Sequence, residues 1–323
     1  MMAQMTYIEA LTKGLHEEMV RDPRVFMLGE DIGTYGGAFR VTKGFLDEFG
    51  PDRIVDTPIS ESAIVGAAIG AAITGMRPVA EMQFIDFMGC AHDIIVNYAA
   101  KSRYRWGVGI PIVIRGPCGG GVSGGPYHSQ NPEACYMNIP GLKIVAPATA
   151  QDAYGLIRAS IQDDDPVIYL EHKFLYRRIK GEVTEELTPI GKARVAREGT
   201  DLSVITYGAM VYVALDAAEK LAADGINVEV VDLRTLLPMD REAIVATVKK
   251  TNKVLILHEA TRTGGPAGEI MAIINEECFE HLDAPLRRIT APDTPVPYAP
   301  SLEKFFLPQV DDVVKVAKDL YEY

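Results

Sequence analysis

The feature that most constrains the fold is a repeated alternation of short apolar runs with stretches of helical pattern. The runs that indicate buried strands occupy residues 25–32, 77–84, 110–117, 142–148 and 166–172. Because neighbouring parallel strands are joined by crossover helices, this alternation predicts a mainly parallel sheet covered by helices on both faces. Residues 1–22 add an amphipathic helical pattern at the N-terminus.

The alternation stops once and then starts again. Residues 177–200 are polar and aperiodic, which predicts a linker or an edge hairpin. Beyond them, strands are expected at 202–208, 226–233, 253–260 and 286–290, and helices at 209–223, 240–250 and 266–281. The proline-rich stretch 291–308 is expected to run extended over a surface.

We therefore predict an α/β protein of two domains, each a mainly parallel sheet flanked by helices. The predicted boundaries are 1–190, including the linker from about 177, and 191–323. A length of 323 residues suits two domains of this size.

The charge balance narrows the range of partners. A net charge of −12 argues against nucleic acid and against an anionic membrane surface, since both need a basic face, and it favours a basic protein partner. No segment offers about eighteen consecutive uncharged apolar residues, so no membrane span is expected. The four cysteines form no CxxC pair and have no zinc-ligand spacing, which predicts free thiols in a reducing compartment.

Residues 56–78, DTPISESAIVGAAIGAAITGMRP, predict a helix of unusually small side chains. Ser60 is the expected N-cap and Gly75 the expected stop signal. The alanines and glycines between them allow close backbone approach, which indicates deep burial or a subunit interface. By itself, Glu61 at the head of this helix is read as an acid that complements the helix dipole.

The glycine-rich run RGPCGGGVSGGPYHSQNPEA, residues 115–134, follows an expected strand and is a candidate phosphate cradle. It has neither GK[ST] nor GxGxxG opening a helix. The pattern is more typical of a flexible loop that delivers His128, either as an acid–base or hydrogen-bonding group or as a solvated loop histidine.

A second candidate segment lies just beyond the expected strand at 77–84. Gln83, Asp86 and Phe87 follow its end, and an aromatic face with a nearby amide suits a flat heteroaromatic ring. Core packing of the phenylalanines is the alternative. The chain has no HExxH, no GxSxG and no evident Cys/His pairing for covalent catalysis.

Seven segments together resemble one family over nearly the whole chain: GEDIG, DTPISESAIVGAAIG, RPVAEMQFIDF, RGPCGGGVSGGPYHSQNPEA, PGLKIVAP, VDLRTLLPMD and TAPDTPVPY. The chain is similar to the beta subunit of the thiamine-diphosphate-dependent 2-oxo acid dehydrogenases, the decarboxylating first component of the pyruvate and branched-chain complexes. Acetoin dehydrogenase beta subunits belong to the same group. The resemblance implies a transketolase-like pyrimidine-binding domain followed by a transketolase C-terminal domain.

The resemblance also implies roles for matching residues. Glu61 is expected to hydrogen-bond N1′ of the cofactor's aminopyrimidine, which favours the imino tautomer whose exocyclic nitrogen takes the proton from thiazolium C2. Ile59 is expected to lie against the cofactor, Phe87 to stack on the pyrimidine and Gln83 to lie beside it. His128 is expected to steady the substrate carboxylate or acyl intermediate and to help transfer to lipoamide.

The same resemblance implies binding sites for two metal ions in the assembled enzyme. Potassium in many members is held largely by backbone carbonyls, here at Ile112, Ser160, Asp163 and Asp165. The GDG motif that commonly holds Mg²⁺ and the diphosphate does not occur in this chain. Because the family's alpha subunit supplies those ligands, the chain is expected to hold only the pyrimidine half of thiamine diphosphate, in an α2β2 tetramer with a beta–beta contact, and to be inactive alone.

The resemblance implies that the C-terminal domain docks the peripheral-subunit-binding domain of the acyltransferase, whose lipoyl domain accepts the acyl group. Acids that could meet this basic partner, or simply form a solvated surface, are Asp283, Asp293, Glu303, Asp311 and Asp312.

Pyruvate is favoured as substrate only because that activity is common, and branched-chain and acetoin-type substrates stay open. The bacterial or archaeal cytoplasm is expected ahead of the mitochondrial matrix, since no transit peptide is seen. A self-sufficient thiamine enzyme of the transketolase kind is disfavoured by the absent diphosphate motif. A non-catalytic scaffold with the same fold is disfavoured because Glu61, Phe87 and His128 occur together.

Overall fold

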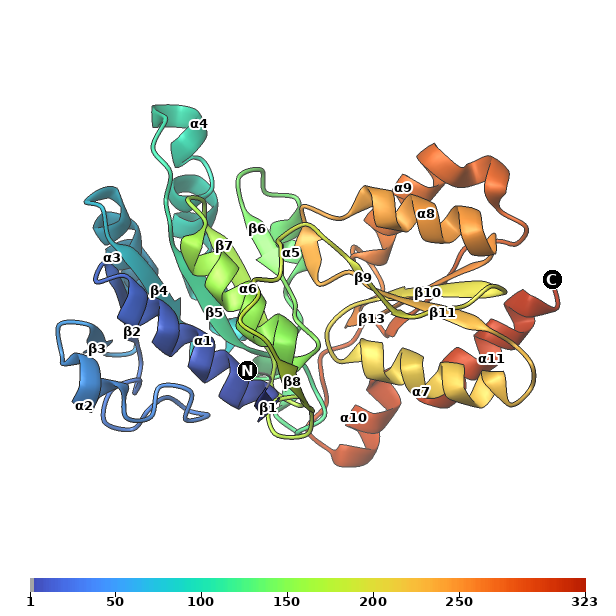
Figure 1. Ribbon diagram of the computed structural model, residues 1–323, viewed down its shortest axis with the longest axis horizontal. Coiled ribbons are helices and arrows are strands. Elements are labelled where there is room, and N and C mark those ends of the chain that lie inside the picture. Colours follow the sequence, from blue (N-terminus) through green and yellow to red (C-terminus); the bar gives the residue numbers. More distant parts are fainter. Residues whose placement is uncertain (1–2) are drawn as a thin grey trace. The chain divides into compact units, whose positions relative to one another are not determined.

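The computed structural model describes residues 3–323, so the first two residues of the predicted N-terminal helix lie outside the described part. The chain divides into two compact units (Figure 1). The first unit runs to Ile190 but leaves out Gly119–Ala134, and this glycine-rich loop groups with Gly191–Tyr323 as the second unit. The predicted first domain, residues 1–190, had included the loop.

The first unit contains a parallel sheet in the order β6-β7-β5-β4-β2-β3. Its strands are β2 Val25–Gly29, β3 Ile54–Asp56, β4 Arg77–Glu81, β5 Val113–Cys118, β6 Lys143–Val145 and β7 Val167–His172. Five of them correspond to the apolar runs of the sequence. The sequence missed β3, because three residues are too short to form a recognisable run.

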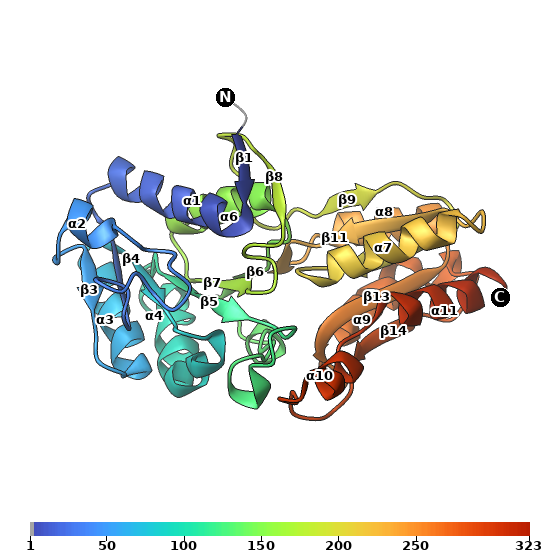
Figure 2. The ribbon, with the colours of Figure 1, turned by 90° about the horizontal axis from the view of Figure 1, so that it is seen from below.

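Helices cover both faces of this sheet, with α1 and α6 side by side on one face and α3 and α4 on the other (Figures 1 and 2). The helices of this part of the chain are α1 Tyr7–Arg21, α2 Phe45–Phe49, α3 Glu61–Ile73, α4 Ser102–Trp106, α5 Ala134–Met137 and α6 Ala150–Gln162, with a 3₁₀ helix η1 Ile85–Ala91 and a π-helical turn η2 Ile94–Ala99. Strand β1 Ala3–Thr6 precedes α1 and pairs antiparallel with β8 Lys180–Val183.

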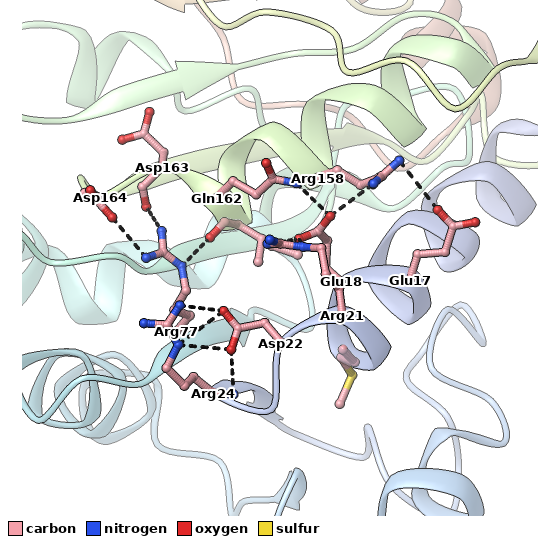
Figure 3. A network of polar contacts seen from close by, with 12 residues as sticks. Glu17, Glu18, Arg21, Asp22, Arg24, Arg77, Arg158, Gln162, Asp163 and Asp164 are labelled. Atoms are coloured by element: carbon pink, nitrogen blue, oxygen red, sulfur yellow. Dashed lines mark hydrogen bonds and ion pairs between the residues drawn. The ribbon is translucent and has the colours of Figure 1, made fainter.

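A polar network joins α1 to α6 (Figure 3). The carboxylate of Glu18 is fully buried and accepts hydrogen bonds from Arg21, Arg158 and Gln162. A buried carboxylate is tolerated when its oxygens are satisfied by donors of this kind, so the network fixes how the two helices pack.

The second unit contains a sheet in the order β14-β13-β10-β11-β9, parallel except for the antiparallel edge strand β9. Its strands are β9 Arg194–Arg197, β10 Leu202–Thr206, β11 Val228–Asp232, β13 Val254–Thr261 and β14 Arg287–Ala291, and a short strand β12 spans Thr235–Leu237. Helices α7 Met210–Ala222 and α11 Val310–Tyr321 lie together on one face, and α8 Arg241–Thr251 and α9 Ala267–Cys278 on the other (Figure 1).

One of the two alternatives for the polar stretch 177–200 was wrong. The stretch does not form a hairpin, because β8 and β9 belong to different sheets, so the linker is the alternative that remains. The proline-rich stretch 291–308 is not extended throughout, because Pro300–Phe306 forms helix α10. Proline suits the first position of a helix, where its missing N–H has no partner to lose, so Pro300 starts this helix instead of preventing it.

Among residues 3–323, no helix is long and apolar enough to cross a membrane. All four cysteines are free, as predicted.

Candidate active site

Glu61, the acid at the head of the small-residue helix, is the first residue of α3 and is half-buried at the carboxyl end of the first unit's sheet. Ser60 occupies the N-cap position, but the expected side-chain cap is wrong. Its hydroxyl donates instead to the carbonyl of Pro58 at 3.0 Å. The Ser60 backbone N–H is used too, because it donates to the carboxylate of Glu30.

Glu30 follows directly on β2 and is an acidic neighbour of Glu61 to which the sequence gave no role. Its side chain is 6% exposed. Burial raises the pKa of Glu30, and the nearby charge of Glu61 raises it further. The only sequence signal was Gly29-Glu30-Asp31 at the end of a buried strand, and it did not show which other acid lay nearby.

Gln83 and Phe87 come to the same edge of the sheet from the segment after β4. The Gln83 amide lies 3.5 Å from a carboxylate oxygen of Asp31, the residue after Glu30. Phe87 lies on η1. The hydroxyl of Ser62 on α3 donates to the carbonyl of Cys90, on the same 3₁₀ helix, at 2.5 Å. The structure therefore brings Glu61, Gln83 and Phe87 together, each half-exposed.

The Phe87 ring contacts Phe84 edge-to-face with 6.1 Å between centroids, and Phe84 contacts Phe39 in the same way. These contacts orient the Phe87 ring. Ile59, on the connection before α3, is 83% exposed and presents an apolar surface near the same edge.

Helix α3 is buried on one face only. Its buried side chains are Ile64, Val65, Ala68, Ile69 and Ala72. The opposite face is exposed, and a Cβ at Gly70 would meet no atom within 4 Å. Of the two readings offered by the sequence, deep burial within the chain is therefore wrong. The interface reading stays a prediction.

A buried ion triad fixes the strand ends beneath this edge. The Arg115 guanidinium pairs with Glu171, with the shortest N–O distance 2.5 Å, and also with Glu81. Burial raises the pKa of Glu81 to about 7, although the charge of Arg115 opposes the shift. Since the carbonyl of Arg115 accepts from the N–H of Met82 at 2.8 Å, the triad also places the residue before Gln83.

The carbonyls predicted to hold potassium lie near the turn after α6. Each of three accepts one hydrogen bond: Ile112 from the Val167 amide, Ser160 from the Asp163 amide and Asp163 from Arg77. A carbonyl has a second lone pair, so these bonds leave ligation open.

The Asp163 carboxylate pairs with Lys143 at 2.6 Å, and that of Asp165 with Arg103 at 2.5 Å. Within residues 3–323, no three His, Cys, Asp or Glu side chains are arranged to hold a metal, but this does not test ligation by carbonyls. Potassium stays a prediction.

The glycine-rich loop lies in the second unit and carries His128 directly after a 3₁₀ turn, η3 Gly125–Tyr127. Three of its amides are already used and are not open for a phosphate. The N–H of Gly120 donates to Glu259 at 2.5 Å, and the N–H groups of Gly121 and Ser123 donate to Glu303 at 2.9 Å. The loop that the sequence described as flexible is tied down by two carboxylates.

Glu303 was one of the five acids expected on a docking surface, and this prediction was wrong. Its side chain is 4% exposed, and it is bound by the loop amides. Two other members of that set also have internal partners, because Asp293 accepts from Thr263 and Asp311 pairs with Lys220.

A third carboxylate, Glu133, lies near the end of the loop and is 1% exposed. The Tyr207 hydroxyl donates to it. Burial raises the pKa of Glu133 to about 7 despite this hydrogen bond, and the charge of Glu259 adds to the increase. The Tyr207 ring stacks on His258 with 6.3 Å between centroids, and burial lowers the pKa of His258 to about 4, so this imidazole is neutral near pH 7.

Residues 3–178 match the family model of the transketolase pyrimidine binding domain, and residues 191–313 match that of the transketolase C-terminal domain. The chain is 52% identical to the 2-oxoisovalerate dehydrogenase subunit beta of Bacillus subtilis (strain 168), with 100% of both chains covered. The chain belongs to the beta subunits of the 2-oxo acid dehydrogenases.

Other beta subunits are also similar. The chain is 45% identical to the pyruvate dehydrogenase E1 component subunit beta of Bacillus subtilis (strain 168), covering 100% of each chain. It is 46% identical to the mitochondrial pyruvate dehydrogenase E1 component subunit beta-2 of Oryza sativa subsp. japonica, covering 98% of this chain and 86% of that one. The predicted family is confirmed.

The fold of this beta subunit is also found in a solved structure described as a split gene transketolase, inactive beta4 tetramer. The TM-score is 0.81 at 23% sequence identity, with 98% of each chain covered. The predicted transketolase-like fold, two units with mainly parallel sheets flanked by helices, is confirmed.

Proposed function

We propose that this beta subunit combines with an alpha subunit into an α2β2 enzyme that oxidatively decarboxylates a 2-oxo acid and passes the acyl group to the lipoyl domain of an acyltransferase. The observation that carries the proposal is the placement of Glu61 beside the buried Glu30, at the sheet edge where Gln83 and Phe87 are half-exposed. Carboxyl ends of parallel strands are where ligands of such folds bind.

The exposed groups at this edge fit the pyrimidine half of thiamine diphosphate. Glu61 would meet N1′, Phe87 would stack on the ring, and the Gln83 amide and Ile59 would flank it. When bound, thiamine diphosphate supplies the nucleophilic carbon that adds to the 2-oxo acid and takes up the electron pair left by decarboxylation.

In this scheme two carboxyl groups of the chain, Glu61 and Glu30, act on the proton at N1′ of the pyrimidine. Glu61 holds it at N1′, and Glu30 keeps its own proton to a higher pH than an exposed glutamate because it is buried and lies near Glu61. One neutral and one charged carboxyl can coexist there, whereas two charges at close range would repel.

The remaining partners belong to the same proposal. Mg²⁺ and the diphosphate would be held by the alpha subunit, potassium by the carbonyls of Ile112, Ser160, Asp163 and Asp165, and the substrate carboxylate or acyl group by His128. The chain alone would be inactive. We place the enzyme in a bacterial or archaeal cytoplasm, in keeping with the bacterial sources of several relatives.

We propose two candidate substrate classes. Pyruvate is the substrate class of several relatives at 44% to 46% identity, by their names. A branched-chain 2-oxo acid is the second candidate, because a relative named 2-oxoisovalerate dehydrogenase subunit beta is 52% identical. Turnover of pyruvate, 4-methyl-2-oxopentanoate and acetoin by the chain reconstituted with an alpha subunit distinguishes the classes.

The cofactor proposal is tested by titrating thiamine diphosphate into the chain with and without the alpha subunit. Tight binding is expected only with both chains, so tight binding by the chain alone would contradict the division of the cofactor between subunits. In the reconstituted enzyme, Glu61→Gln should lower kcat by at least about a hundredfold, the usual scale for a positioned proton-transfer group. Glu280→Gln, at an exposed position, is the control, and unchanged turnover in Glu61→Gln would refute the mechanism.

A further inference from the structure

The amides of the glycine-rich loop converge on two side chains of the second unit. Glu303, on α10, accepts from the N–H of Gly121 at 2.9 Å and from the N–H of Ser123 at 2.9 Å and 3.1 Å through its two oxygens. Glu259, at the end of β13, accepts from the N–H of Gly120 at 2.5 Å and from the Asn131 amide at 3.0 Å. The two carboxylates thus hold the loop on both sides of His128.

The loop backbone is shaped for an anion. Gly119, Gly121 and Ser123 all have positive φ, at 80°, 83° and 58°. Alternation of left-handed with other backbone conformations turns successive N–H groups toward one point, the arrangement that binds phosphates in other proteins. Here the anion is the carboxylate of Glu303, which has both oxygens bound to the loop.

The space around the loop is closed as well. A Cβ at Gly120 would lie 3.1 Å from Leu307 and 3.4 Å from an oxygen of each carboxylate. Gly125, at φ 69°, faces the ring of Tyr298, where an added Cβ would come within 2.1 Å. These contacts fix the backbone up to the η3 turn that precedes His128.

We propose that Glu303 is a positioning residue, which holds the glycine-rich loop so that His128 has one defined orientation for the reaction. This inference rests on the proposed function for the role of His128, but the holding of the loop is independent of it. The carboxylate oxygens of Glu303 accept from the loop amides and from the Ser123 hydroxyl, so the charge of this side chain serves the loop and not a partner protein.

The first test measures hydrogen exchange of the full chain by mass spectrometry. In Glu303→Gln one accepting oxygen is replaced by a donor that faces the Ser123 N–H, so exchange of peptides covering Gly119–Gly125 should become about tenfold faster. Glu303→Asp retains the charge and should show a smaller increase, and it replaces the glutamine variant if that one fails to fold. Glu280→Gln should leave the loop peptides unchanged.

The second test uses the reconstituted enzyme and a double-mutant cycle with His128→Ala. Glu303→Gln should lower kcat by about tenfold or more without changing the KM for the 2-oxo acid, because misplacement of a reacting group affects the chemical step. In the His128→Ala background the same substitution should have little further effect, since Glu303 acts through His128.

Unchanged exchange of the loop in Glu303→Gln would overturn the inference. If Glu303→Gln lowered kcat by the same factor in the wild-type and His128→Ala backgrounds, the inference would also be overturned, because Glu303 would then act by a route other than His128. Wild-type turnover in His128→Ala alone would instead refute the proposed role of His128, and the exchange measurement would still decide whether Glu303 holds the loop.

Discussion

Glu133→Gln should remove a pH dependence from the stability of the second unit. The Glu133 side chain is buried, and its pKa is raised from 4.5 to about 7, chiefly by burial. The native state therefore binds this proton more tightly than the unfolded chain does. The stability that comes from the proton is present in full below the pKa of the unfolded carboxyl, and it is lost as pH rises through the native pKa.

The size of the effect follows from the increase in pKa. A pKa raised by about 2.5 corresponds to about 3 kcal/mol between the two limits of pH. Between about pH 5.5 and about pH 8.5, roughly 2 kcal/mol of this is lost from the wild type. Glutamine keeps an oxygen that accepts from Tyr207 but does not titrate. The free energy of unfolding of Glu133→Gln minus that of the wild type should therefore rise by about 2 kcal/mol over this range.

The assay is urea unfolding of the purified chain followed by circular dichroism. The chain has a single tryptophan, Trp106, which lies in the first unit, so its fluorescence reports that unit separately. Glu280→Gln, an exposed substitution in the second unit, supplies the control. A difference between Glu133→Gln and wild type that stays constant from acid to alkaline pH would refute the reasoning, because Glu133 would then ionise like an exposed glutamate.

Two further substitutions test the first unit. Arg115→Met leaves Glu81 and Glu171 buried without their common cation and should destabilise the unit by about 3–5 kcal/mol at neutral pH. The loss should shrink at acid pH as the carboxyls become protonated, and a loss independent of pH by Trp106 fluorescence would contradict this account. Gly141→Ala should destabilise by more than about 2 kcal/mol, because Gly141 has φ 99° and an added Cβ would lie 2.0 Å from the carbonyl oxygen of Ala100. Gly75→Ala in the same unit, at φ 100° but with no atom within 4 Å of an added Cβ, separates backbone strain from the clash in thermal unfolding.

The strands could be predicted from the sequence because each is an apolar run bounded by turn residues, a signal contained within the strand itself. The edge strands could not. Strand β3 has three residues, and β8 and β9 are short and partly exposed, so their pairing partners decide that they are strands. Helix α10 was missed because the four other prolines of the stretch 291–308 outweighed the one proline at a helix start.

The candidate site shows a similar division. Glu61, Gln83 and Phe87 were predicted from the segments that carry the family resemblance, and the structure brings them to one sheet edge. Glu30 could not be assigned from its own segment, because its unusual environment comes from burial and from a residue on another element. A pKa is a property of the folded surroundings, and no short motif records it.

The glycine-rich loop carries the most instructive discrepancy. Its glycines allow a backbone that turns N–H groups toward an anion, and the run lacks the two phosphate-binding fingerprints. The sequence could not indicate that the anion is internal, because Glu303 lies 180 positions beyond Ser123 and was read as a surface acid. Because the amides of Gly120, Gly121 and Ser123 already donate to carboxylates, they are not available to a phosphate, and the group that this loop offers to a reaction is the side chain of His128.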